Sequence, residues 1–300
     1  MVCAIIDIGS NTMRMSVYKI EDQQFRVLLS KKETAGLVNY ISEGTMSEEG
    51  IEEMIAVLRQ FCASLEYVNV DAIHAFATAS LRNITNSRQI MERIRRDVGV
   101  EIELISGAEE AMLSFAGAVS ASPFTDGCLF DLGGGSTEIV AFDGRHPYYI
   151  SSLDMGCLNL FKGHVEKILP KKREVGEMRG FIEESLSKIE LPHTPKPLLI
   201  GVGGTARSLR RLINFRAKRD DSYKEITRTE LDEIIEFLLK KDAASRDVIL
   251  KKCPDRIHTI IPGALVIQAL AEKMGADRLY ISDYGVREGY LWKKVIKPTT

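Results

Sequence analysis

The chain contains 300 residues, of which 45% are hydrophobic, and its formal net charge at pH 7 is −2. This length allows one large domain or two of ordinary size, with enough apolar residues to form buried cores. The nearly balanced charge argues against general nucleic-acid binding, so a polyanionic ligand would have to be bound by local basic groups and backbone amides. No segment has the apolar length of a membrane helix and no signal peptide is evident, so we expect a cytoplasmic protein.

The cysteines and histidines predict neither disulfides nor a zinc site. The histidines form no cluster, and the cysteines are scattered in apolar surroundings without a C-x-x-C pair: Cys3, Cys62, Cys128, Cys157 and Cys253. We therefore expect buried thiols in a reducing compartment.

Hydrophobic periodicity predicts strands and helices that alternate along the chain. The first part has strands at 3–8, 13–18 and 25–30, a helix near 48–65, a strand at 72–77, a helix at 87–98 and a strand at 101–105. A helix from 106 leads to strands at 129–132, 137–140, 148–153, 198–202 and 279–281, with helices from 157, at 174–189, 229–241 and 261–274, and a last helix through 295. This alternation predicts an α/β layered fold.

Two charged residues in the first part are candidates for chemistry. Arg82 follows the strand at 72–77, where open α/β sheets place ligand-binding groups, and a guanidinium suits phosphate in charge and geometry. Ser106 and Glu109 have the spacing of a capping box, which gives Glu109 a structural role, whereas Glu110 faces away from the apolar stripe and could accept a proton from water. The alternatives are a surface arginine that covers a helix end and a first-turn glutamate that complements the helix dipole.

A glycine turn, Gly133-Gly134-Gly135-Ser136, lies between two apolar runs. Consecutive glycines leave backbone amides unshielded, and such amides can converge on a phosphate. Asp131 and Glu138 flank the turn, and carboxylates beside a phosphate require a cation, which points to a magnesium phosphate. A glycine-rich hairpin with solvated acids is the alternative.

Two further turns resemble this one. Asp7-Ile8-Gly9-Ser10-Asn11-Thr12 repeats its pattern near the start of the chain, which suggests two similar halves, each with one loop for a polyphosphate ligand, facing across a cleft. Gly203-Gly204-Thr205 follows the strand at 198–202, and the segment Gly201 to Ala206 fits the dinucleotide fingerprint G-x-G-x-x-A. Its position deep in the chain favours a third phosphate or nucleotide loop instead.

Together these residues resemble the exopolyphosphatase and guanosine pentaphosphate phosphatase family, within the superfamily of actin, sugar kinases and heat-shock chaperones. Seven blocks, in order over nearly the whole chain, carry the resemblance: Asp7 to Thr12, Thr78 with Leu81, Arg82 and Asn86, Ser106-Gly107 with Glu109-Glu110-Ala111, Asp131 to Glu138, Gly203-Gly204-Thr205, Pro262-Gly263-Ala264, and Ser282-Asp283 with Arg287-Glu288-Gly289.

The resemblance implies an actin-like fold of two ribonuclease H-like α/β domains that enclose a cleft. Domain I would cover residues 1–121 and domain II residues 122–285, and a final helix at about 286–300 would pack back on domain I. The expected activity is metal-assisted attack of water on the end phosphate of inorganic polyphosphate or of guanosine pentaphosphate. A homodimer is expected only by analogy.

The resemblance also assigns roles to residues. Glu110 would be the base that activates water, and Arg82 would hold the terminal phosphate. Mg²⁺ would be positioned by Asp131 and Glu138, with Asp7 as a further candidate ligand. The phosphate-binding residues would be those of the three turns: Gly9, Ser10, Asn11, Thr12, Gly133, Gly134, Gly135, Ser136, Gly203, Gly204 and Thr205.

Two departures from the family pattern bear on substrate preference. Met112 stands where the family often has an arginine, and Leu158 or Asn159 stands where a basic residue is expected, so either change would weaken the binding of a long polyanion or shift the preferred substrate. Two other functions remain open: a kinase of the same superfamily, and a non-catalytic sensor of polyphosphate or of an alarmone.

Overall fold

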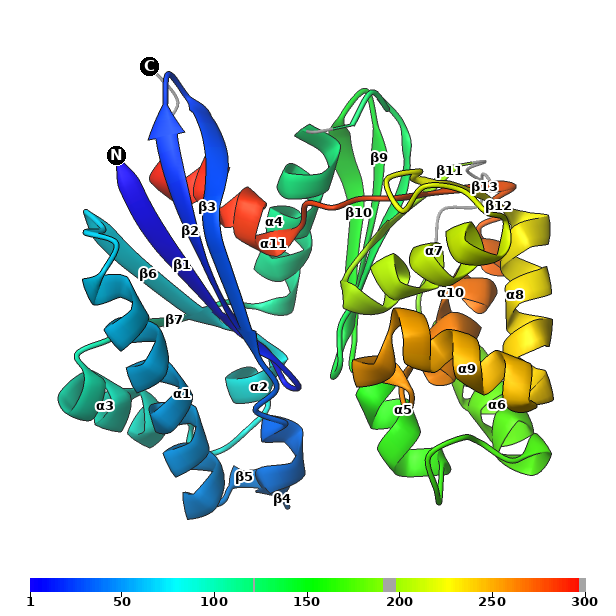
Figure 1. The fold of residues 1–300 in the computed structure, drawn as a ribbon, viewed down its shortest axis with the longest axis horizontal. Helices are drawn as coiled ribbons and strands as arrows, with labels where there is room; N and C mark the ends of the chain where they lie inside the picture. The colour runs from blue at the N-terminus through cyan, green and yellow to red at the C-terminus, as the bar shows by residue number, and fades with distance from the viewer. Residues whose placement is uncertain (121, 191–197, 297–300) are drawn as a thin grey trace. The chain divides into compact units, whose positions relative to one another are not determined.

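The computed structural model describes residues 1–120, 122–190 and 198–296, and the chain forms two compact units (Figure 1). Unit 1 contains Met1–Glu110 and Tyr290–Thr300, and unit 2 contains Ala111–Gly289. The chain therefore passes between the units within helix α4 (Gly107–Ser120) and at the end of helix α11 (Val286–Tyr290). This division falls before the expected boundary at 121/122 because α4 packs its apolar face on the sheet of unit 2.

Unit 1 is built on a five-stranded sheet with the order β3-β2-β1-β6-β7. Its strands are β1 (Val2–Ile8), β2 (Met13–Glu21), β3 (Gln24–Glu33), β6 (Ala72–Ala77) and β7 (Ile102–Leu104). The first three strands form an antiparallel meander, and β6 and β7 join it in parallel. Helices α1 (Glu48–Glu66) and α3 (Ser87–Val98) provide the two crossover connections.

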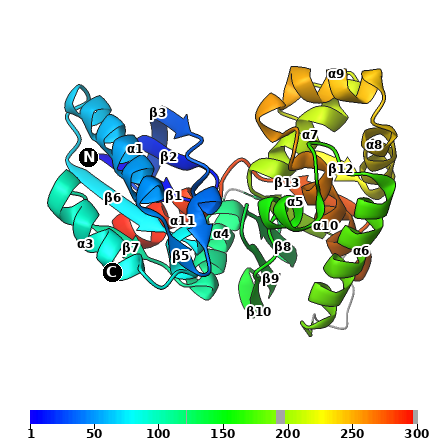
Figure 2. The same ribbon diagram turned by 90° about the horizontal axis from the view of Figure 1, so that it is seen from below.

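The sheet of unit 1 is covered on both faces. On one face, α1 and α3 lie next to each other and bury a core with alternate residues of β1 and β2 (Figure 2). On the other face, the Tyr290 ring stacks on Phe76 with centroids 5.0 Å apart, and Trp292 packs edge-on against Phe25. These aromatic contacts place the described part of the last helical segment, α11 with η3 (Leu291–Val295), on this sheet; residues 297–300 of the expected final helix lie outside the described residues.

Shorter elements complete unit 1, and most of them were not expected from the sequence. They are η1 (Leu37–Tyr40), β4 (Ile41–Ser42), β5 (Thr45–Met46) and α2 (Ala79–Arg82). Elements of two to four residues are too short to show a hydrophobic period.

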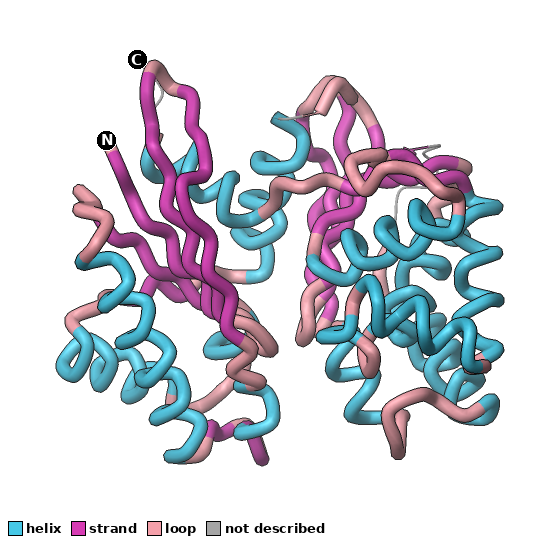
Figure 3. The backbone as a smooth tube through the Cα atoms, in the orientation of Figure 1, coloured by secondary structure: helices cyan, strands magenta, loops and turns pink. Residues whose placement is uncertain are grey.

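Unit 2 is built on a six-stranded sheet with the order β10-β9-β8-β11-β13-β12. Its strands are β8 (Gly127–Leu132), β9 (Thr137–Asp143), β10 (His146–Leu153), β11 (Leu198–Val202), β12 (Glu225–Thr227) and β13 (Arg278–Ile281). The helical elements are α5 (Cys157–His164), α6 (Lys172–Ser187), α7 (Gly204–Arg216), α8 (Arg228–Lys240), α9 (Ala243–Lys252), η2 (Pro254–Arg256) and α10 (Ile260–Lys273). Figure 3 shows these helices gathered on one side of the sheet.

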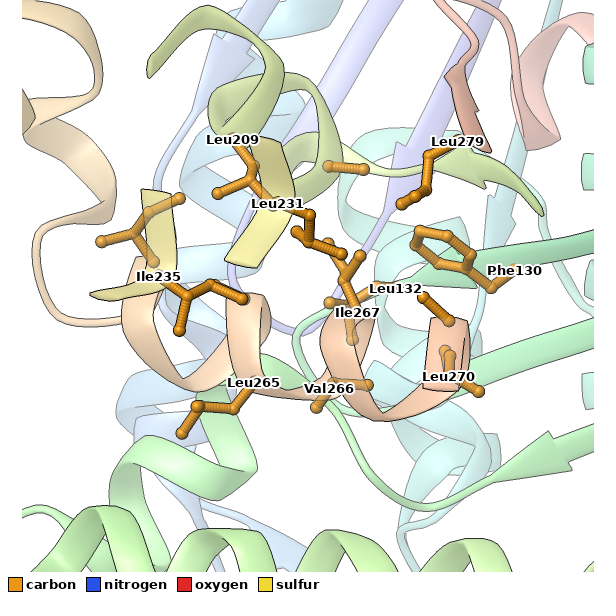
Figure 4. Close-up of a cluster of buried hydrophobic side chains, with 14 of the residues drawn as sticks. Phe130, Leu132, Leu209, Leu231, Ile235, Leu265, Val266, Ile267, Leu270 and Leu279 are labelled. Carbon is orange, nitrogen blue, oxygen red and sulfur yellow. The ribbon is translucent and has the colours of Figure 1, made fainter. Parts of the chain in front are cut away.

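The main core of unit 2 lies between its sheet and the helices α5 to α10 (Figure 4). Phe130 and Leu132 of β8 extend into this core, where they meet side chains of α7, α8 and α10. Helix α10 is the predicted apolar helix, and it is buried over most of its length. Helix α9 was not predicted because its apolar residues form no stripe; only Ser245 and Ile249 of this helix are buried.

Helix α4 covers the opposite face of the sheet of unit 2, where Ala111 and Phe115 pack against Leu129 and Val140. Glycine is required where α4 meets α11. A Cβ atom on Gly117 would lie 2.0 Å from the carbonyl oxygen of Gly285, so the two segments touch through their backbones.

The two units share one strand arrangement. The order β3-β2-β1-β6-β7 in unit 1 corresponds to β10-β9-β8-β11-β13 in unit 2, with antiparallel pairs on one side of the first strand and parallel pairs on the other. This is the order of ribonuclease H-like domains, so the predicted α/β fold class is confirmed. None of the helices in the described part of the chain is both long and apolar enough to cross a membrane.

The burial of the cysteines generates the first prediction. Burial raises the pKa of Cys128 to about 12 and the pKa of Cys3 to about 11. Cys62 is partly exposed, whereas the other four cysteines are buried. Because the thiolate is the reactive form, iodoacetamide at mildly alkaline pH should modify Cys62 of the folded protein slowly and the other four cysteines hardly at all.

Mass spectrometry of the alkylated protein measures this labelling. Guanidinium chloride is the control, because unfolding should expose all five thiols to the reagent. Rapid labelling of two or more cysteines without denaturant would contradict the burial described here.

Candidate functional site

The two predicted repeat turns have the same backbone geometry. The amide of Gly9 donates to the carbonyl oxygen of Thr12 at 3.1 Å, and the amide of Gly133 donates to that of Ser136 at 3.0 Å. Each turn closes an antiparallel hairpin, β1–β2 in one unit and β8–β9 in the other. The repetition seen in the sequence is therefore a repetition of structure.

The turn of unit 2 offers backbone amides to a ligand. Within the described residues, the amides of Gly134, Gly135 and Ser136 have no hydrogen-bond partner. Successive unpaired amides in a turn form a concave group of donors that suits an anion. The three consecutive glycines thus leave amides available to a ligand, and the binding of phosphate by them stays a prediction.

Asp131 and Glu138 lie directly opposite each other on β8 and β9, so their side chains share the sheet face that α4 covers. Ser114 of α4 donates a hydrogen bond to Asp131, and Ser152 donates to Glu138 at 2.9 Å. Burial raises the pKa of Asp131, although the hydrogen bond from Ser114 and the charges of Arg207 and Arg287 oppose this effect.

The two carboxylates fit part of a magnesium site. Mg²⁺ is commonly held by one or two carboxylates together with water and substrate phosphates, and Asp131 and Glu138 supply such a pair. The third candidate ligand, Asp7, belongs to unit 1. In the ranges that the structure describes, no group of three or more His, Cys, Asp or Glu side chains could hold a metal, so any ion would need ligands beyond the protein carboxylates.

The third glycine turn lies at the same sheet edge as the second. Strands β8 and β11 are parallel neighbours, with Val202 opposite Asp131, so the residues that follow them emerge together. Gly203 has a φ of +101°, and a Cβ atom there would lie 2.5 Å from the carbonyl oxygen of Leu132. Only glycine permits this close approach.

Arg256 is a residue of this turn region that the sequence analysis missed. Its guanidinium covers Gly204 and donates to the hydroxyl of Thr205 at 3.3 Å. The Thr205 hydroxyl is buried and in turn donates to the sulfur of Cys157. Since that side chain is engaged inside the protein, the predicted phosphate-binding role of Thr205 depends on its backbone.

Arg82 and Glu110 form an ion pair in unit 1. Nη1 of Arg82 lies 2.8 Å from Oε2 of Glu110 and 3.3 Å from the carbonyl oxygen of Ile105. The two side chains are only 17% and 11% exposed. The two residues are predicted from the sequence on separate grounds, and in the structure they are in contact.

The first turn lies at the same sheet edge as this pair. Strands β1 and β6 are parallel neighbours, so the turn after Ile8 and the segment with Arg82 both emerge at the carboxyl ends of adjacent strands. The hydroxyl of Ser80 ties the two segments by donating to the carbonyl oxygen of Ile8 at 2.5 Å. At this edge of its sheet, unit 1 thus combines a glycine turn, the guanidinium of Arg82 and the carboxylate of Glu110.

The predicted capping box at the start of α4 is only half formed. The amide of Glu109 donates to the hydroxyl of Ser106 at 3.2 Å, as expected. The Glu109 carboxylate, however, accepts a hydrogen bond from Lys294 at 2.6 Å. The prediction was wrong about this carboxylate because its partner is distant in the sequence.

The model of the Ppx/GppA phosphatase family matches residues 16–297 of the chain. The chain belongs to this family. Exopolyphosphatase 1 of Mycobacterium tuberculosis is 26% identical over 305 residues, which cover 97% of this chain and 87% of that protein. Exopolyphosphatase 2 of the same species is 28% identical over 316 residues, which cover 95% and 96% of the two chains.

Solved structures of related proteins have the same fold. The Ppx/GppA family member of Aquifex aeolicus matches with a TM-score of 0.81 and 28% identity, covering 100% of this chain and 99% of that one. An exopolyphosphatase from Cytophaga hutchinsonii matches with a TM-score of 0.87, 22% identity and 97% coverage of both chains. The predicted family and fold class are both confirmed.

The contact between Ser114 and Asp131 generates the second prediction. Ser114→Ala should lower the free energy of unfolding by about 1–3 kcal/mol, because Asp131 would lose a donor at a buried position. Ser120→Ala, at the exposed end of the same helix, should change it by less than about 0.5 kcal/mol. Urea denaturation of the parent and both variants measures the difference, and equal loss in the two variants would contradict a specific role for Ser114.

Proposed function

We propose that this protein is an exopolyphosphatase, a hydrolase that releases orthophosphate from the end of inorganic polyphosphate. The observation that carries the proposal is the Arg82–Glu110 ion pair, which lies beside a glycine turn at one sheet edge. Membership of a phosphatase family and the names of the mycobacterial relatives support the same activity.

Glu110 is the proposed general base. Its carboxylate is nearly buried and is held by Arg82, so its position is defined before substrate binds. Water attacks the terminal phosphorus, the bond to the bridging oxygen breaks, and the proton of the water passes to Glu110 while the shortened chain leaves with the electron pair. A carboxylate suits this role because its ionised form can accept the proton that the attacking water loses.

Arg82 is the proposed anchor of the terminal phosphate. A guanidinium has five donors, and the contacts of Nη1 with Ile105 and Glu110 fix its orientation. Positive charge here would stabilise the transferred group as charge accumulates on its oxygens. Arg82 thus brings the phosphorus next to the base.

The glycine turns are proposed to bind the phosphates of the chain through backbone amides. The three unpaired amides of Gly134, Gly135 and Ser136 are the donors in unit 2, and the Gly9 turn and the Gly203 turn supply similar backbone. Asp131 and Glu138 would hold Mg²⁺, whose charge would offset the repulsion between these acids and the substrate.

Guanosine pentaphosphate is the second candidate substrate, because the motifs of the sequence resemble a family that contains phosphatases for either substrate. A kinase would instead require an acceptor, and a sensor would bind without turnover. Phosphate release with Mg²⁺ from long-chain polyphosphate, guanosine pentaphosphate and ATP in parallel separates these functions. Polyphosphate should be the best substrate, and EDTA should abolish its hydrolysis; binding of polyphosphate without release from any of the three would contradict the proposal.

The role of Glu110 generates the third prediction. Glu110→Gln should lower kcat by at least about a hundredfold and leave the affinity for polyphosphate nearly unchanged, because the amide is almost isosteric but cannot accept the proton. The adjacent Glu109→Gln is the matched control, since that side chain binds Lys294. Steady-state kinetics of both variants measure the effect, and parent-like kcat in Glu110→Gln would rule out this base.

The role of Arg82 generates the fourth prediction. Arg82→Ala should raise KM and lower kcat together, because the guanidinium both binds the phosphate and orients Glu110. Arg88→Ala, which removes an arginine whose side chain is 89% exposed, is the control for the loss of one positive charge. A pure KM effect, equal in both variants, would show that Arg82 acts only through long-range attraction.

A further inference from the structure

The start of α5 binds the glycine turn of unit 2 through the carbonyl oxygens of the turn. The amide of Cys157 donates to Gly133 at 3.1 Å, and the amide of Leu158 donates to Gly134 at 2.9 Å. The side-chain amide of Asn159 donates to the carbonyl oxygen of Gly135 at 2.9 Å. Three consecutive carbonyl groups of the turn are therefore held by one helix end.

These contacts determine the directions of the unpaired amides. In a planar trans peptide, the C=O of one residue and the N–H of the next point in opposite directions. The carbonyls of Gly133, Gly134 and Gly135 are paired in this way with the amides of Gly134, Gly135 and Ser136. Each carbonyl held by α5 therefore directs one unpaired amide away from α5, toward the side where an anion could bind.

The first amides of a helix usually lack partners and can bind an anion themselves. In α5 the first amides donate hydrogen bonds to the carbonyl oxygens of the turn. This helix end therefore positions the turn and does not serve as a separate anion site. The packing is tight enough to require glycine at 156, where a Cβ atom would lie 2.2 Å from the carbonyl oxygen of Gly134. The turn and the helix end are thus joined by hydrogen bonds and by close backbone packing.

The turn of unit 1 has the same construction. The carbonyl oxygen of Ser10 accepts a hydrogen bond from the amide of Val38 at 3.0 Å, and that of Asn11 accepts from the amide of Gly36 at 2.9 Å. In unit 1 these donors are backbone groups, whereas in unit 2 the Gly135 carbonyl is held by a side chain. Asn159 is therefore the member of this arrangement that mutation can remove without changing the backbone.

We propose that Asn159 is a positioning residue that orients the Gly135–Ser136 peptide, so that the Ser136 amide points at a phosphate of the substrate. The inference rests on the proposed phosphate-binding role of the turn. It also bears on the departure from the family pattern at Leu158 or Asn159, where a basic residue is expected. At position 159 the neutral amide supplies a hydrogen-bond donor to the backbone and no charge for the polyanion.

Two substitutions separate positioning from other effects. Asn159→Ala removes the donor without adding charge, and Asn159→Asp replaces the donor with an acceptor that repels the Gly135 carbonyl. Asn159 is the third residue of α5, and an acidic residue in the first turn stabilises a helix or leaves it unchanged. A merely structural role would therefore leave Asn159→Asp at least as functional as Asn159→Ala.

Gln89 provides the matched control, because it is the third residue of α3, is exposed and carries the same side-chain amide. Gln89→Ala and Gln89→Asp make the same chemical changes at an equivalent helix position. They should leave ligand binding and turnover at the parent level.

The experiment measures the affinity for inorganic tripolyphosphate by calorimetry, together with steady-state hydrolysis of polyphosphate and thermal unfolding. We expect Asn159→Ala to weaken tripolyphosphate binding about five- to tenfold, since one neutral hydrogen bond is lost. Asn159→Asp should weaken it further with an unchanged or higher melting temperature. In both variants kcat/KM should fall by at least the factor lost in affinity.

Three results would overturn the inference. The first is parent-like binding of tripolyphosphate in both Asn159 variants. The second is weaker binding in Asn159→Asp alone, which would indicate charge repulsion, and the third is a loss of binding that parallels a lower melting temperature in both variants. A parent protein that binds tripolyphosphate without hydrolysing polyphosphate would contradict the proposed function and leave the binding comparison intact. A parent that binds no tripolyphosphate would contradict both proposals.

Discussion

Close approach of backbone to backbone around the turn Gly133–Ser136 is the constraint on which the candidate site of unit 2 depends. A Cβ atom on Gly156 would overlap Gly134, and one on Gly203 would lie 2.5 Å from the carbonyl oxygen of Leu132. The end of β8, the start of α5 and the start of α7 can therefore meet only because the two glycines, Gly156 and Gly203, place no side chain between them. Backbone donors, which keep their positions far better than long side chains, are thereby concentrated at one edge of the sheet.

The same topology places chemistry at the corresponding edge of unit 1, but with different groups. Parallel pairing of β1 with β6 puts the Gly9 turn beside the segment with Arg82. In unit 1 the residues near the turn form the Arg82–Glu110 ion pair, whereas in unit 2 they are the acids Asp131 and Glu138. The two units thus share a fold but carry different side chains near the turn. Those of unit 1 suit a general base and the binding of an anion, and those of unit 2 suit the binding of a cation.

Much of this fold could be predicted from the sequence, because each central strand is an apolar run and each turn is marked by glycine. The strand at 72–77 has the bounds predicted for it. The contacts within the site were harder to predict, since they join residues that lie far apart in the chain. Arg82 is 28 positions from Glu110, and Lys294 is 185 positions from Glu109, and no local pattern encodes such pairs.

Residues with ordinary local roles were missed for a related reason. Asn159 was noted only for its lack of charge, and Arg256 lies in a short helical turn without periodicity. The donor function of Asn159 became visible only when the carbonyl that accepts its hydrogen bond was known. Sequence reasoning identifies residue types that suit a ligand, but it does not identify the side chains that orient the backbone.

The charge balance around Asp131 links these observations to the proposed chemistry. Burial disfavours the ionised carboxylate of Asp131, and the charges of Arg207 and Arg287 favour it, so the buried acid and the two arginines interact electrostatically. Within the described residues, Nη1 of Arg287 is buried without a hydrogen-bond partner, and an unsatisfied buried donor costs free energy. An anionic phosphate would pair with the arginines and a divalent cation would pair with the carboxylate, so a metal-bound phosphate suits both kinds of group at once. Independently of the family comparison, these charges favour a phosphate that carries a cation, which is the class of ligand proposed for the turn of unit 2.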